Sequence, residues 1–151
     1  MKNFSRLVAS LLTTAWVGGL WAVGFLAVPV LFYAQPDRQL AGILAGQMFT
    51  LVSYLGIVCG LYLLVQRMSV SGRASFRQAR FWIVAVMLLI TMVLQFGIQP
   101  VMTGLKLEAM PLDVMHSALA ARFSMLHHVS STIYTIESLL GVVLVVKSEL
   151  A

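Results

Sequence analysis

Apolar residues dominate four long stretches of this chain, and most charged residues fall in the segments between them. The stretches cover about residues 7–33, 42–65, 81–102 and 123–146, and none of them contains Lys, Arg or Asp. A helix needs about 20 mostly apolar residues to cross the hydrocarbon core of a bilayer. The pattern therefore predicts an all-α membrane protein, a four-transmembrane-helix bundle that forms a single integral membrane domain over residues 1–151.

Composition agrees with this prediction, because 60% of the residues are hydrophobic and only 10% are charged. A soluble domain carries about a quarter charged residues. The net charge of +5 does not indicate nucleic-acid binding, since the basic residues lie between apolar stretches and not in one patch. The first stretch is longer than the apolar region of about 7–15 residues in a signal peptide, so we expect a retained helix. The lipid bilayer is the expected partner.

The distribution of basic residues predicts the orientation in the membrane. Seven of them fall on one side if both termini share the side of the segment between the second and third stretches: Lys2, Arg6, Arg67, Arg73, Arg77, Arg80 and Lys147. The positive-inside rule puts that side in the cytoplasm, so we expect a multi-pass inner (plasma) membrane protein with cytoplasmic N- and C-termini. The spacing of Arg73, Arg77 and Arg80 predicts one face of a helical extension of the third span.

Small residues form a stripe along the predicted second helix. At 100° per residue its members fall within about 80° of one another. They are Gly42, Gly46, Ser53, Gly56 and Gly60. Such a stripe favours close helix packing in lipid, with the first span as the natural partner within the chain. A homo-oligomer or a partner in a membrane complex would use the same kind of surface.

Polar residues of the fourth stretch gather within an arc of about 120°, and His128 points away from it. On the third stretch, glutamines are spaced four residues apart. Polar side chains in a membrane usually face the bundle interior, so we expect a polar pocket on the outer side. Its candidate residues are Arg122, His127, Ser130, Ser131, Tyr134, Glu137, Gln95 and Gln99. Alternatively, the same residues form hydrogen bonds between helices and bind no ligand. The lone carboxyl of Glu137 is expected to be protonated, paired or functional.

A soft metal ion such as Cu(I) is an alternative ligand, because thioether and imidazole groups gather toward the outer side. The candidates are His116, His127, His128, Met115 and Met125. No fixed ligand spacing appears, and methionine also fills gaps in apolar cores. No cofactor is predicted. A redox protein using quinone or heme is a distant alternative, since the first three spans contain no histidine.

Catalytic motifs are absent from the sequence: it has no phosphate loop, no dinucleotide fingerprint and no recognisable nucleophile–base motif. We therefore predict a non-enzymatic accessory or scaffold role. Pro111 is well placed to begin a helix. The sequence leaves open whether residues 111–122 lie on the outer surface or continue the fourth helix.

Two stretches carry a resemblance to a known family. In "RFSMLHHVSSTIYTIESLLG" the matching positions are Arg122, Phe123, His127, Ser130, Ser131 and Gly141, and in "WVGGLWAVGFLAVPVLF" they are Trp16, Gly18, Gly19 and Pro29. The chain resembles the membrane family that includes eukaryotic transmembrane protein 205, known in bacteria as domain of unknown function 4149. The resemblance implies four spans, no settled biochemical activity, and a link to heavy-metal or platinum-drug tolerance that favours the soft-metal alternative. His128 and Tyr134 depart from the family pattern, which has glycine and asparagine there.

Overall fold

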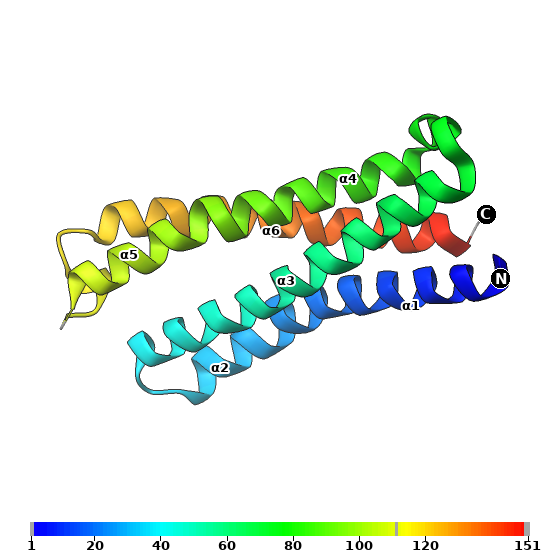
Figure 1. Ribbon diagram of the computed structural model, residues 1–151. Coiled ribbons are helices and arrows are strands. Elements are labelled where there is room, and N and C mark those ends of the chain that lie inside the picture. Colours follow the sequence, from blue (N-terminus) through cyan, green and yellow to red (C-terminus); the bar gives the residue numbers. More distant parts are fainter. Residues whose placement is uncertain (1, 111, 150–151) are drawn as a thin grey trace.

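The computed structural model describes residues 2–110 and 112–149, and within these residues it contains helices and no strand (Figure 1). Four helical rods run along its length. The first joins α1 (Lys2–Trp21), the π-helix η1 (Ala22–Ala27) and α2 (Val28–Ala34). The second joins α3 (Arg38–Ser71) and the 3-10 helix η2 (Gly72–Arg77). The third joins α4 (Ala79–Met92), the π-helix η3 (Val93–Ile98) and α5 (Gln99–Ala109), and the fourth is α6 (Ala120–Glu149), which follows the short 3-10 helix η4 (Val114–His116).

Each rod contains a helix long and apolar enough to cross a membrane, so the predicted all-α bundle of four transmembrane helices is confirmed. The helices extend beyond the apolar stretches, over Phe4–Ala34, Arg38–Arg77, Ala79–Ala109 and Ala120–Ser148. The difference arises because an apolar stretch ends at its first charge, whereas lysine, arginine and glutamate are good helix formers. Lys106, for example, lies inside α5 and not in a loop.

Within the bundle, α1 and α4 each pack against both α3 and α6. Both described chain ends and η2 lie at one end of the bundle, which we call the terminal end (Figure 1). The connections formed by residues 35–37 and 112–119 lie at the other end, which we call the distal end. Toward the distal end the rods form two pairs, because α2 packs on α3 while α5 packs on α6.

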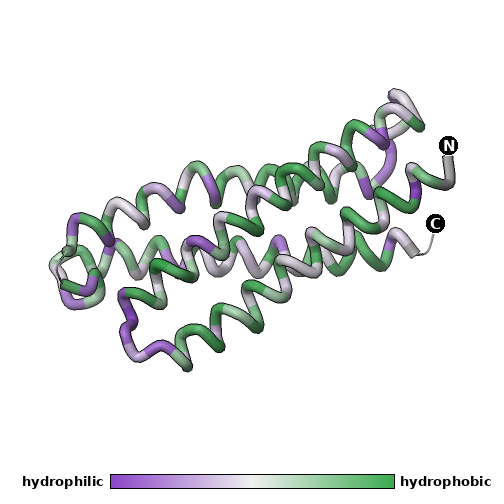
Figure 2. Tube along the Cα trace, turned by 60° about the horizontal axis from the view of Figure 1, so that its bottom comes forward, coloured by the Kyte–Doolittle hydropathy of each residue, from purple (hydrophilic) through white to green (hydrophobic). Residues whose placement is uncertain are grey.

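The apolar core is split in the same way. Its larger cluster is centred on the fully buried Trp16, with neighbours from all four rods such as Val52, Met87 and Leu144. A smaller cluster at the distal end joins α5, η4 and α6 around Met102. The outer surface is apolar too, and Figure 2 shows hydrophobic residues along the rods with hydrophilic ones concentrated near the connections and ends. An apolar exterior on apolar helices is what lipid contact requires, so the chain is a multi-pass membrane protein.

Each π-helix ends two residues before a proline. Pro29 and Pro100 occupy the first turn of α2 and α5. A proline lacks the backbone N–H and its ring crowds the carbonyl four residues earlier, which belongs to Phe25 or Phe96 here. Both of these residues lie inside the π-helices, where the wider turn relieves the crowding.

The connections are held by side chains. Asp37 caps α3, since its Oδ1 accepts from Gln39 N at 2.9 Å and Leu40 N at 3.0 Å. At the terminal end, Gly72 has a φ of +53°, a left-handed conformation that favours glycine and ends α3. Because α4 begins at Ala79, Arg73 and Arg77 lie in a 3-10 turn, and their predicted place on a helical extension of the third span is wrong.

The second distal connection is also a turn. Asp113 Oδ1 accepts from Met115 N at 2.9 Å, and Ser117 Oγ accepts from Leu119 N at 3.1 Å. α6 begins at Ala120, so residues 112–119 do not extend the fourth helix. The prediction that Pro111 begins a helix falls outside the described residues.

Candidate functional site

Glu137 is buried in the middle of the bundle, with only 1% of its surface exposed. Its Oε1 lies 2.5 Å from Oγ1 of Thr91 on α4, and the same Thr91 Oγ1 lies 3.0 Å from Met87 O. A hydroxyl carries one proton, so it can donate to only one of these oxygens. Both contacts are hydrogen bonds at once when a protonated Glu137 carboxyl donates to Thr91 and Thr91 donates to Met87 O. The geometry therefore fits a neutral carboxyl.

A cavity of about 340 Å³ extends from Glu137 toward the distal end, and we call it the inner cavity. All four rods contribute walls to it: Leu20 and Gly24 from the first, Phe49 and Ser53 from the second, Thr91 and Gln95 from the third, and Ser130 and Tyr134 from the fourth. It combines apolar and aromatic walls with a few polar groups, which is typical of ligand pockets.

A second cavity of about 470 Å³, the distal cavity, lies among the ends of the rods and the distal connections. Its walls include Phe32, Arg38, Lys106, Asp113, His116 and Phe123. Five residues line both cavities: Val28, Phe49, Gln99, Met102 and His127. The two cavities therefore adjoin, and together they lead from the distal end to Glu137.

Most of the predicted pocket residues come together in the inner cavity. They are Gln95, Gln99, His127, Ser130, Ser131, Tyr134 and Glu137. Arg122 is different, because it is exposed and lines neither cavity. His127 stacks on Phe123, with ring centroids 6.2 Å apart, whereas the neighbouring His128 lines neither cavity.

Tyr134 fixes one wall of the inner cavity. Its hydroxyl donates to Leu20 O at 2.6 Å, where α1 passes into η1, and its ring packs edge-on against Phe49. Gly24 of η1 leaves the space that the tyrosine ring occupies, since an added Cβ there would lie 3.0 Å from the Tyr134 oxygen and still closer to the ring. The sequence analysis did not identify Gly24, because the π-helical turn and the tyrosine ring that require a glycine there are seen only in the folded bundle.

Two polar side chains of α5 reach across the distal cavity to α3. Lys106 Nζ donates to Gly42 O at 2.9 Å and lies 5.5 Å from the Phe123 ring centroid. Gln99 Nε2 donates to Gly46 O at 3.3 Å. The sequence analysis did not include Lys106, which lies beyond the third apolar stretch, although its position seven residues after Gln99 puts both side chains on one helix face.

The small-residue stripe of α3 faces the inside of the bundle. A Cβ on Gly56 would collide with the Trp16 indole, and one on Gly60 would lie 3.1 Å from both Trp16 and Leu88. Ser53 lines the inner cavity, while Gly42 and Gly46 face the Lys106 and Gln99 side chains described above. The stripe thus admits large side chains of neighbouring helices.

The candidate metal ligands are divided between two surroundings. Met115, His116 and His127 line the distal cavity together with Met102, whereas His128 and Met125 line neither cavity. Among the described residues there is no group of three or more His, Cys, Asp and Glu side chains that could hold a metal ion. A soft metal would have to be bound through the methionine thioethers as well.

Comparison with known proteins gives one family. The family described as Domain of unknown function (DUF4149) matches residues 11–111, from the first rod to the end of the third. The curated proteins and the solved structures contain no match to the chain. The matched range ends before α6, so His127 and Glu137 lie outside it.

Proposed function

The chain belongs to the Domain of unknown function (DUF4149) family, and we propose that it is a non-enzymatic inner-membrane protein that binds a small amphipathic solute in a pocket open at the distal end. One observation carries this proposal: the distal and inner cavities adjoin and lead to the buried Thr91–Glu137 pair. Cavities of 340 and 470 Å³ fall within the size range of small-molecule pockets.

The walls suggest the class of solute. Phe32, Phe49 and Phe123 offer aromatic surface for an apolar body. Gln95, Ser130 and Ser131 offer hydrogen bonds for a polar end. The solute would lie with its polar end toward Glu137, because a neutral carboxyl can both donate and accept a hydrogen bond.

The hydrogen bonds of the pocket support a binding role over catalysis. Thr91 contacts Met87 O, Gln99 contacts Gly46 O, and Tyr134 contacts Leu20 O. These polar groups bind helix backbones, so they hold the rods in position around the cavity. An accessory role in a membrane complex, or as a homo-oligomer, would use the outer helix faces, because the small-residue stripe is covered within the chain.

We place the terminal end in the cytoplasm. Both ends of the described chain and the arginine-rich turn η2 lie at that end (Figure 1), and basic residues are retained on the cytoplasmic side of the membrane. The pocket mouth at the distal end then faces the outside of the cell.

Accessibility of a cysteine inside the pocket tests the proposal. In a Cys59→Ala background, Ser130→Cys should react with a small water-soluble methanethiosulfonate. Adding Gly46→Leu should slow the reaction about tenfold or more, because the leucine would fill part of the distal cavity against Gln99, which lines both cavities. Gly18→Leu is the matched control, because an added Cβ at Gly18 meets nothing within 4 Å. An unreactive Ser130→Cys, or equal effects of the two leucines, would refute a solvent-connected pocket.

Binding of a soft metal is the second candidate, because two thioethers and two imidazoles line the distal cavity. Titration of the purified protein with Ag(I), a redox-stable substitute for Cu(I), measures it directly. His127→Ala should weaken binding, while His128→Ala should not, since His128 lies outside both cavities. Equal losses in both variants, or no binding by the wild type, would eliminate this candidate.

A further inference from the structure

A third cavity, of about 390 Å³, lies at the terminal end, far from the proposed pocket. We call it the arginine cavity, because three rods each contribute an arginine to its lining: Arg6 from α1, Arg67 from α3 and Arg80 from α4. Hydroxyl and amide groups complete its polar lining, among them Ser10, Thr13, Gln66 and Ser148. Three guanidinium groups around one cavity repel one another unless an anion lies between them.

Specific contacts hold this end of the bundle together. Gln66 Nε2 donates to Ser5 Oγ at 3.0 Å, which joins α3 to α1 beside Arg67 and Arg6. Ser75 is fully buried, and its hydroxyl donates to Arg67 O at 2.8 Å. These hydrogen bonds hold the backbone around the three arginines in place, so the cavity is a defined part of the fold.

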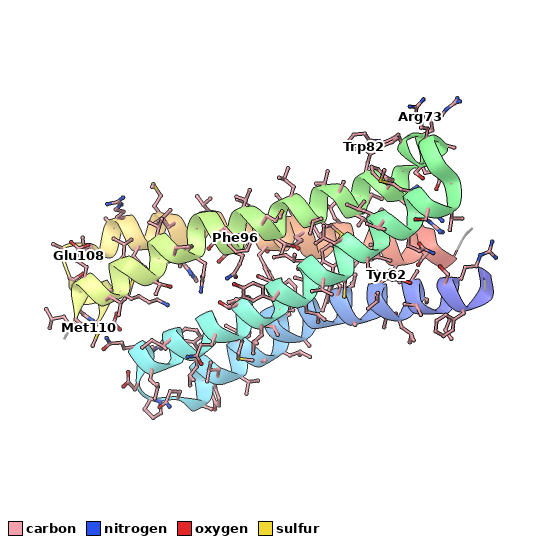
Figure 3. All side chains as sticks on the ribbon, viewed as in Figure 1. Tyr62, Arg73, Trp82, Phe96, Glu108 and Met110 are labelled. Carbon is pink, nitrogen blue, oxygen red and sulfur yellow. The ribbon has the colours of Figure 1, made fainter. Side chains whose placement is uncertain are left out.

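Arg80 supplies the second observation. Its Nη2 atom is buried and has no hydrogen-bond partner among the described residues. A buried guanidinium nitrogen without a partner is costly, so such groups are normally paired. The neighbouring arginines Arg73 and Arg77 differ, because both are exposed in the η2 turn, and Figure 3 shows Arg73 pointing away from the bundle.

Acidic residues are scarce near this cavity. Asp37, Glu108 and Asp113 lie toward the distal end, and Glu137 lies in the middle of α6. Only Glu149, the last residue of α6, lies at the terminal end. The positive charge of three arginines is thus far in excess of the acidic charge available there.

We propose that the arginine cavity binds a phosphate group, carried either by a lipid headgroup or by a soluble phosphate ester. The planar guanidinium group of arginine can donate two parallel hydrogen bonds to phosphate oxygens. Arg80 has a donor available for such a contact, because its Nη2 has no hydrogen-bond partner among the described residues. The cavity lies at the end of the membrane-spanning helices, where anionic headgroups attract basic residues. This inference does not depend on the solute pocket.

Thermal unfolding of the detergent-purified full chain tests the site. Two probes are titrated: inorganic phosphate, and dioleoyl phosphatidylglycerol in mixed micelles, with dioleoylglycerol as the lipid that lacks phosphate. At least one phosphate probe should raise the Tm saturably, whereas dioleoylglycerol should not. A response to phosphatidylglycerol alone identifies a lipid headgroup as the source, and a response to inorganic phosphate identifies a soluble one.

Arginine variants then assign the effect to the cavity. Arg80→Gln and Arg67→Gln should each weaken the apparent affinity about tenfold or more, as expected for loss of a charged hydrogen bond. Arg73→Gln, with the same loss of charge on an exposed residue, should change it less than about twofold. Without phosphate, the Tm of Arg80→Gln should not fall below that of the wild type, because the variant removes the buried Nη2 atom that has no hydrogen-bond partner among the described residues.

Two results would overturn the proposal. One is a wild type that neither phosphate probe stabilises, and the other is an Arg73→Gln variant as weak as Arg80→Gln, which would show diffuse charge attraction. If Arg80→Gln does not fold, Arg67→Gln gives the same comparison.

Discussion

Thr91 on α4 and Glu137 on α6 join two rods through a buried contact of 2.5 Å between Thr91 Oγ1 and Glu137 Oε1. Both side chains are at most 2% exposed. Thr91 also contacts Met87 O in its own helix, so the pair links a carboxyl to a helix backbone through one hydroxyl. The strength of the Thr91–Glu137 contact therefore depends on which of the two side chains donates the hydrogen bond between them.

Glu137→Gln should therefore retain most of the stability, because the glutamine amide can donate to Thr91 as a protonated carboxyl does. Glu137→Ala should cost about 1–3 kcal/mol, since it leaves a cavity and removes a buried hydrogen bond. Thermal unfolding in detergent compares the two variants. If the glutamine variant lost as much stability as the alanine variant, the contact would need an ionised carboxylate.

A second prediction concerns the contact between Gly24 and Tyr134. Gly24→Ala should destabilise the protein by about 1–3 kcal/mol, because the new methyl overlaps the tyrosine ring. Gly18→Ala in α1 should be neutral or slightly stabilising, as expected for glycine replaced in an open part of a helix. Chemical denaturation of both variants measures the difference. The Gly24→Ala loss should shrink in a Tyr134→Ala background, and an unchanged loss would show that the two residues are not coupled.

The two halves of the small-residue stripe should respond differently to alanine. Gly56→Ala collides with the buried Trp16 indole and should lower the Tm clearly. Gly42→Ala should be tolerated, since its Cβ would lie an ordinary 3.5 Å from Lys106 Nζ. Thermal unfolding of the pair decides the point, and equal losses at both positions would mean that the stripe packs uniformly along its length.

Orientation can be tested by labelling from one side of the membrane. In a Cys59→Ala background, Arg73→Cys in η2 should be protected in intact cells from a membrane-impermeant maleimide and labelled after the cells are opened. Gln39→Cys at the distal end should be labelled in intact cells. The reverse pattern would place the terminal end outside the cytoplasm, and with it the mouth of the pocket on the cytoplasmic side.

The sequence was sufficient for the spans and for one helix face. Long apolar stretches determine membrane helices almost by length alone. The spacing of His127, Ser130, Tyr134 and Glu137 predicts that they share one face of α6, because an isolated helix already defines its faces. All four line the inner cavity, although His127 is exposed. The same reasoning separated His128 from that face.

The cavities and the arginine cluster could not be predicted in this way. Cavity volume depends on how far α2 and α3 separate from α5 and α6, and this separation is set by contacts between distant residues such as Lys106 and Gly42. Trp16 fills the space beside Gly56 and Gly60. The small-residue stripe predicts that a neighbouring side chain can pack there, but it does not predict which one. Arg6, Arg67 and Arg80 are far apart in the chain and meet only in the folded bundle.

The two π-helices, finally, have a consequence for how this protein tolerates changes in length. A π-helical turn contains about one residue more than an α-helical turn, and each residue turns an α-helix by about 100°. Deleting one residue from Ala22–Ala27 should restore a regular α-helix and leave α2 in nearly the same phase relative to α1, because six π-helical residues turn the chain about as far as five α-helical ones. Phe32 would stay at the cavity wall, so these turns let each rod gain or lose one residue without rotating its distal helix.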